Sequence, residues 1–165
     1  MKRHRYEGYA EHRAPARADR ADSVVYVELP DDPGVFKWEQ LPARRVSADH
    51  YEICAVPFFA YDLALGDIVE TSRVTGHGIV NLRIERVVSP SGHETYRVRF
   101  HHDVASDPEG TRLLEWIQSL GCEYELWSPR TAAIDTDDDN AQVLADYLWD
   151  RYQAGAFEYE TGRTV

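Results

Sequence analysis

The spacing of apolar residues changes part-way along the chain. Before residue 89, apolar and polar residues alternate, which is the pattern of half-buried β-strands. This alternation covers residues 23–29, 35–39, 50–56, 66–70 and 79–88, with turn-forming residues such as Pro30-Asp31-Asp32-Pro33-Gly34 between the segments. We therefore expect residues 23–92 to form a β-rich subdomain, either a small sheet or an open barrel.

Helical spacing first occurs after residue 106. Asp107-Pro108-Glu109 has the features of a helix start, with a capping carboxylate, a proline in the first turn and an acid near the positive end of the helix dipole. Apolar residues at helical spacing follow, and Gly121 is typical of a helix end. A second helix is expected to begin at Asp137 or Asp138. Its buried stripe would consist of Ala141, Leu144, Tyr147, Leu148 and Tyr152.

Strand-like alternation surrounds both helices, at residues 93–102, 122–126, 131–135 and 156–160. The resulting order, β-α-β-β-α-β, is that of the ferredoxin-like fold. We predict an α+β protein in which the N-terminal sheet or barrel precedes a ferredoxin-like subdomain over residues 93–161. In that topology the first and last strands pair. Arg97 and Arg99 should then lie beside Glu158 and Glu160 on an open, solvated sheet face.

Charge is unevenly distributed along the 165 residues, whose formal net charge is −11. Residues 1–22 have a net charge of +2 and few aliphatic side chains, so we expect a flexible tail there, with a second tail at residues 162–165. Residues 102–165 carry four arginines against fourteen acids, a net charge of −10. Such a surface repels nucleic acid and attracts a basic protein partner.

Other classes of protein are disfavoured by the composition. No apolar run is long enough to span a membrane, and the charged first residues lead into no signal peptide. Two cysteines, Cys54 and Cys122, do not make a disulfide framework. We expect a cytoplasmic protein.

Several segments together resemble one known family. They are Val56-Pro57-Phe58-Phe59-Ala60-Tyr61, Leu65-Gly66-Asp67-Ile68-Val69, Gly92-His93, Gly121-Cys122, Ala145-Asp146-Tyr147-Leu148 and Phe157-Glu158-Tyr159-Glu160. In these segments the chain resembles the bacterial domain of unknown function numbered 4265, over roughly residues 24–161. The resemblance implies a bacterial origin and an α+β architecture, and it implies no activity, cofactor or catalytic residue.

Candidate catalytic chemistry is sparse. His77, His93, His101 and His102 lie on or beside one expected hairpin, but no paired spacing typical of zinc ligands occurs, so we predict no metal site and no cofactor. No nucleophile motif or glycine-rich phosphate loop is present. If the chain is an enzyme or binds a small ligand, the site would lie in the cleft between the two halves. His93, Asp67 and Tyr61 are the first candidates for such a site.

The densest charged run is Asp135-Thr136-Asp137-Asp138-Asp139-Asn140. These acids can cap the second helix, but capping needs only one carboxylate. We therefore propose Asp135, Asp137, Asp138 and Asp139 as an acidic docking edge. The leading hypothesis is a non-enzymatic interaction protein or inhibitor, similar in role to an immunity protein. An enzyme or ligand-binding module with its site in the cleft is the alternative.

Overall fold

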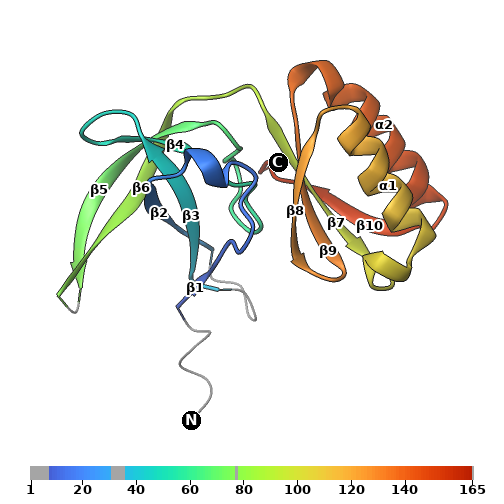
Figure 1. Cartoon of the computed structure of the whole chain (residues 1–165), viewed down its shortest axis with the longest axis horizontal. Helices are drawn as coiled ribbons and strands as arrows, with labels where there is room; N and C mark the ends of the chain where they lie inside the picture. Colours follow the sequence, from blue (N-terminus) through green and yellow to red (C-terminus); the bar gives the residue numbers. More distant parts are fainter. Residues whose placement is uncertain (1–7, 31–35, 77, 165) are drawn as a thin grey trace, which may run out of the picture.

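A computed structural model describes residues 8–30, 36–76 and 78–164. Within this part of the chain the fold is mixed α+β, as predicted, with two sheets and two α-helices (Figure 1). The first sheet contains β1 (Tyr9–Ala10), β2 (Ser23–Glu28), β3 (Trp38–Arg45), β4 (His50–Ile53), β5 (Ile68–Gly76) and β6 (Ile79–Ser89). The second contains β7 (Glu94–Phe100), β8 (Glu123–Ser128), β9 (Thr131–Thr136) and β10 (Phe157–Thr161). The helices are α1 (Pro108–Ser119) and α2 (Asp138–Gln153), and short 3-10 turns lie at Ala18–Arg20 and Val104–Ser106.

The N-terminal sheet closes on itself. Its strand order is β1-β3-β2-β6-β5-β4, and β3 also pairs with β4 through Ala43 to Arg45. Strands β2 to β6 therefore form a closed ring, completed by the parallel pairing of β2 with β6. Val25, Leu41, Ile53 and Val69 fill its interior and are fully buried. The expectation of a small sheet or open barrel is corrected on this point, because strand closure depends on pairings between distant segments that alternation does not reveal.

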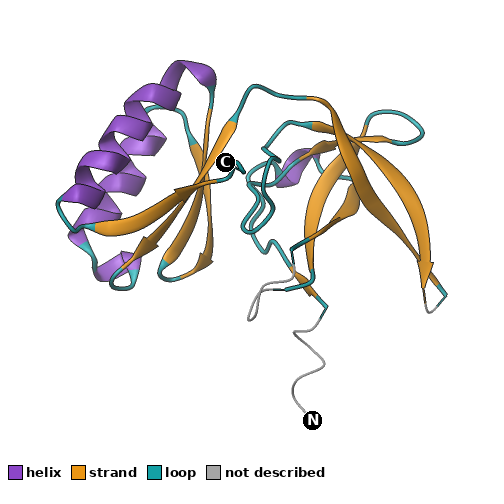
Figure 2. Cartoon of the chain, turned by 180° about the vertical axis from the view of Figure 1, so that it is seen from behind, coloured by secondary structure: helices purple, strands orange, loops and turns teal. Residues whose placement is uncertain are grey.

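The C-terminal half is a four-stranded antiparallel sheet with both helices on one face. The strand order is β10-β7-β9-β8, and Phe157 of β10 lies opposite Phe100 of β7. Figures 1 and 2 show α1 and α2 on the side of this sheet that faces away from the barrel. Apolar residues from the sheet and both helices form one core, including Val98, Phe157, Ile117 and Leu144. None of the described helices is both long enough and apolar enough to span a bilayer.

Local sequence determines where both helices begin. The Asp107 side chain accepts hydrogen bonds from the N–H groups of Glu109 (3.0 Å) and Gly110 (3.4 Å), as the sequence predicted. Asp137 caps α2 and accepts the Asn140 N–H at 2.9 Å. The expected buried stripe of α2 is correct at Leu144 and Leu148, but Tyr152 is 44% exposed because it lies at the edge of the sheet beside β10.

The expected tails are corrected where the structure describes them. Residues 8–22 pack against the body of the protein: β1 pairs with β3, and the Arg17 N–H donates to the Cys54 carbonyl. Residues 1–7 and Val165 lie outside the described residues. At the other end, Gly162 is buried and donates to the Thr95 carbonyl. Tertiary hydrogen bonds hold these segments, and their composition alone gave no sign of them.

The barrel covers part of the sheet face that was expected to be solvated. Arg97 pairs with Glu160 at 3.1 Å but is only 7% exposed, since its guanidinium also donates to the carbonyls of Phe59 and Ala60. Arg99 and Glu158 form the exposed ion pair that was predicted. Both Phe58 and Phe59 contact Trp127 of β8, with ring centroids 5.4 and 5.1 Å apart. The Phe58-Phe59 segment thus joins the two halves.

Candidate functional site

A buried histidine lies between the two halves of the protein. The His12 side chain is fully buried, with Nε2 2.8 Å from Glu39 Oε1 of β3 and Nδ1 2.7 Å from Glu125 Oε1 of β8. Its ring stacks on Phe58 at a centroid distance of 4.1 Å and an interplanar angle of 2°. Each half of the protein therefore contributes one carboxylate to the same imidazole.

The two carboxylates also bind backbone N–H groups. Glu39 accepts hydrogen bonds from Phe58 (2.6 Å), Phe59 (3.0 Å) and Ala60 (2.8 Å), and Glu125 accepts from Val56 (2.5 Å) and Ala16 (3.2 Å). Burial by itself would lower the pKa of His12, but its hydrogen bonds to Glu125 and Glu39 outweigh burial and raise the pKa to about 9.

This cluster has a structural role. Both ring nitrogens of His12 are hydrogen-bonded and the ring is buried, so the imidazolium cannot reach a substrate. Sequence reasoning missed it because Glu39 and Glu125 are 27 and 113 residues from His12. A lone histidine in an arginine-rich segment gives no signal of such contacts.

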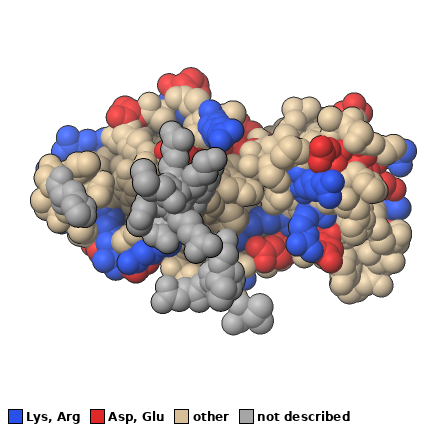
Figure 3. Space-filling view, turned by 90° about the horizontal axis from the view of Figure 1, so that it is seen from below, with Lys and Arg blue, Asp and Glu red and all other residues tan. Residues whose placement is uncertain are grey.

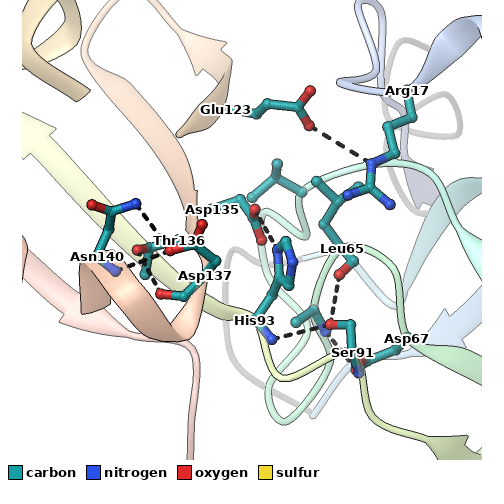
Figure 4. A network of polar contacts seen from close by, with 12 residues as sticks. Arg17, Leu65, Asp67, Ser91, His93, Glu123, Asp135, Thr136, Asp137 and Asn140 are labelled. Carbon is teal, nitrogen blue, oxygen red and sulfur yellow. Dashed lines mark hydrogen bonds and ion pairs between the residues drawn. The ribbon is translucent and has the colours of Figure 1, made fainter. Parts of the chain in front are cut away.

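A second histidine, His93, lies in the linker between the halves, residues 90–93 between β6 and β7, and belongs to an Asp–His pair. Its Nδ1 is 2.7 Å from Asp135 Oδ2 of β9. The His93 side chain is 24% exposed and that of Asp135 is 5% exposed. Burial raises the pKa of Asp135 to about 6, although the hydrogen bond to His93 opposes the shift. Asp135, expected on a docking edge, is therefore inside the molecule and orients the imidazole of His93 (Figure 4).

Asp67 is close to this pair, and both oxygens of its carboxylate are already hydrogen-bonded. Its two oxygens accept hydrogen bonds from the N–H groups of Ser91 (2.8 Å) and Ala64 (2.9 Å), and the residue is 5% exposed. Ser91 Oγ in turn donates to the Leu65 carbonyl at 2.8 Å and accepts the His93 N–H at 3.1 Å (Figure 4). These bonds fix the linker and hold Ser91 away from any role as a nucleophile activated by His93.

A pocket of about 320 Å³ opens where the linker, the loop before β5 and the C-terminal segment meet. His93 and Asp67 line it, together with Thr95 and the Glu94–Arg163 ion pair, whose atoms are 2.8 Å apart. The Thr95 hydroxyl is buried and has no hydrogen-bond partner among the described residues. Tyr61, the third candidate, is not part of this pocket. Its hydroxyl donates to Glu160 at 2.8 Å, and its ring centroid is 4.8 Å from the Arg97 guanidinium.

The other acidic candidates lie at the start of α2. Asp137 is the N-cap, while Asp138 and Asp139 are exposed in the first turn. The exposed surface continues along the helix, and we call it the α2 outer face. It consists of Asp138, Asp139, Gln142, Val143, Asp146, Trp149, Asp150, Tyr152 and Gln153.

Metal-binding and thiol chemistry find little support. Within the described ranges no group of three or more His, Cys, Asp or Glu side chains is arranged to hold a metal ion, and His77 lies outside those ranges. Cys54 and Cys122 are both free and buried, and burial raises the pKa of each thiol.

Comparison with known proteins gives a family but no activity. The family model described as "Domain of unknown function (DUF4265)" matches residues 39–159. The chain belongs to this family. Among solved structures, it is similar to one titled "Novel crystal structure of a hypothetical protein from Neisseria gonorrhoeae". The TM-score is 0.71 at 20% identity, covering 86% of this chain and 94% of the other, which shows a shared fold. No curated protein matches.

Proposed function

We propose that this DUF4265 protein is a non-enzymatic interaction protein whose α2 outer face binds a basic protein partner. One observation carries the proposal: all four charged residues of that face, Asp138, Asp139, Asp146 and Asp150, are acidic. On the neighbouring helix α1, the exposed charges are mixed, with Arg112 beside Glu115. A surface with one sign of charge attracts a partner of the opposite sign.

Helix stability does not account for all of these acids. Asp138 and Asp139 lie in the first turn, where the helix dipole favours negative charge. Asp150 lies in the last turn, where the same dipole disfavours a carboxylate by about 0.3–1 kcal/mol. Asp146 lies one turn before it. The helix dipole therefore does not explain the exposed carboxylate of Asp150, which is available to a partner.

The acidic charge of the α2 outer face also differs from the mixed charge seen elsewhere on the surface. In the view from below, acidic and basic side chains lie side by side on both halves (Figure 3). Elsewhere in the C-terminal half exposed arginines pair with acids, as Arg99 does with Glu158. The acids of the α2 outer face form no ion pair with another described residue, so they contribute to the field that an approaching partner meets.

In this role the protein would be an inhibitor, like an immunity protein, that covers the basic surface of a toxin or a similar target. Nucleic acid is disfavoured as a partner because phosphate groups would be repelled by α2. The order β7-α1-β8-β9-α2-β10 supports a ferredoxin-like topology for the C-terminal half. Two free, buried cysteines suit a reducing cytoplasm, and the Neisseria neighbour supports a bacterial origin.

A pull-down from the native host with a charge-neutralised variant tests the function. We define the α2-neutral variant as Asp138→Asn, Asp139→Asn, Asp146→Asn and Asp150→Asn. The barrel-neutral control removes the same number of exposed charges from the N-terminal half, by Asp19→Asn, Glu28→Gln, Asp49→Asn and Glu85→Gln. A partner identified by mass spectrometry should be basic, be released at high salt, and be lost only with the α2-neutral variant. Equal recovery by both variants would contradict the proposal.

A second candidate function rests on the pocket beside His93. An imidazole whose Nδ1 is held by a buried aspartate can exchange protons through Nε2, which is the arrangement of a general acid or base. The buried Thr95 hydroxyl could hydrogen-bond a ligand in the same pocket. Crystal soaks with a fragment library, compared between wild type and Thr95→Val, test this candidate. Fragments bound against His93 and Thr95 would support it, and an empty pocket in every soak would count against it.

A further inference from the structure

Two large aromatic side chains are exposed on the last turns of α2. Trp149 is 57% exposed and Tyr152 is 44% exposed. Their ring centroids are 6.0 Å apart at an interplanar angle of 37°, and Tyr152 also contacts Tyr159 of β10 at 5.8 Å. Burying such rings is strongly favourable, and tryptophan, tyrosine and arginine dominate the energetics of protein interfaces. Their exposure makes these two rings candidate interface residues on grounds other than the nearby acids.

Acidic side chains lie directly beside the aromatic rings. Residues three apart are neighbours on a helix surface, so Asp146 lies next to Trp149 and Trp149 next to Tyr152. The Asp146 carboxylate accepts a hydrogen bond from Gln142 at 2.8 Å, and that bond occupies one oxygen. The other oxygen has no partner among the described residues. Asp150 continues the acidic edge one turn later. The α2 outer face therefore presents two exposed aromatic side chains beside a carboxylate oxygen of Asp146 that has no partner among the described residues.

We propose that Trp149 and Tyr152 bind an arginine side chain of the basic partner, with Asp146 pairing to its guanidinium. The inference rests on the proposed function and names the group that anchors the partner. Arginine fits because its planar guanidinium stacks on aromatic rings and donates in a fork that matches a carboxylate. A lysine ammonium has the charge but neither the plane nor the fork, and it is more strongly hydrated.

Alternative occupants of this face fit less well. A second copy of the chain in a symmetric dimer would bring the same acids of α2 against each other, and like charges repel across an isologous contact. An uncharged apolar partner would have to desolvate Asp146 and Asp150 without compensation. A basic segment carrying arginine satisfies both the rings and the carboxylates.

Two labelled peptides of equal length and charge, one arginine-rich and one lysine-rich, test the inference by fluorescence anisotropy. Wild type should bind the arginine peptide about two- to fivefold more tightly, which is the range expected for one exposed cation–π contact. Trp149→Ala should bind both peptides with the weaker, lysine-like affinity. Leu126→Ala, which truncates a 44% exposed side chain elsewhere in the same half, should keep the arginine preference. Circular dichroism of each variant verifies that it is folded.

The outcomes separate the two proposals. If wild type binds both peptides equally and Trp149→Ala changes neither affinity, the arginine anchor is wrong while charge-driven binding remains. If wild type binds neither peptide at low salt, the docking function of the face fails as well. A shift of the Trp149 indole N–H signal in NMR spectra on adding the arginine peptide, absent with the lysine peptide, would support the anchor directly.

Discussion

Replacing His12 by glutamine should destabilise the protein severely. The imidazolium is held between Glu39 and Glu125, whose side chains are 0% and 2% exposed. Without it, two buried carboxylates would face each other with no positive charge between them. Breaking a buried ion pair by removing one partner costs about 3–5 kcal/mol. A glutamine amide has N–H donors for these carboxylates but brings no charge, so we expect a loss in this range.

The pH dependence gives an independent measure of the same contact. The folded-state pKa of His12 is about 9, above its ordinary value of 6.5, so folding is coupled to binding of a proton. The stabilisation is therefore complete below about pH 6.5 and is lost as the pH rises through about 9. The shift corresponds to about 3 kcal/mol in the free energy of unfolding.

Urea denaturation at pH 6 and pH 10 tests both statements. Between these two pH values the free energy of unfolding of wild type should fall by about 3 kcal/mol more than that of His12→Gln. The variant His102→Gln, in an exposed turn, should keep wild-type stability at pH 6. If His12→Gln and wild type show the same stability at pH 6, or parallel pH profiles, the imidazolium does not hold the two halves together as described.

Three further predictions follow from other contacts. Arg97→Met, which removes a buried guanidinium from the carbonyls of Phe59 and Ala60, should cost about 2–4 kcal/mol in urea denaturation, while Arg99→Met, at an exposed pair, should cost under about 1 kcal/mol. Gly110→Ala should lower the melting temperature despite better helix propensity, because the added Cβ would lie 2.8 Å from Val104 Cγ2. We expect a net loss of about 1 kcal/mol in the free energy of unfolding, and a higher melting temperature would refute this. Burial raises the pKa of Asp135 from its ordinary 3.8 to about 6, so the protonated carboxyl favours the folded state. The free energy of unfolding should therefore fall by about 3 kcal/mol as the pH rises through this interval. Asp135→Asn should abolish that fall in denaturation curves at pH 4 and pH 7.

Local patterns in the sequence located most secondary structure. The alternation at Tyr96, Val98 and Phe100 gives β7, and Asp107-Pro108 gives the start of α1, because pleat and capping depend on neighbouring residues. The same reasoning failed for residues 8–22. That segment is held by the backbone bond from Arg17 to Cys54 and by His12, which contacts Glu39 of one half and Glu125 of the other, so its contacts are tertiary and not local.

The sequence likewise predicted only some residues of the candidate site. His93 and Asp67 were named from sequence, and both line one pocket. Asp135 was predicted to lie on the surface, because a run of acidic residues is typical of a solvent-exposed segment. Strand alternation turns Asp135 inward toward His93 while Asp137 caps the helix. Trp149 was not predicted as a binding residue. The sequence alone does not show whether an aromatic residue of a helix lies on its exposed face or on its buried face.

The central claim is that the acids of α2 steer a basic partner. Stopped-flow association with the identified partner, at low and at physiological ionic strength, tests it most directly. The account predicts that the α2-neutral variant associates about tenfold more slowly at low salt, with a melting temperature close to that of wild type and a smaller salt dependence. The barrel-neutral control should associate at nearly the wild-type rate. An α2-neutral variant that associates as fast as wild type at low salt would contradict the claim.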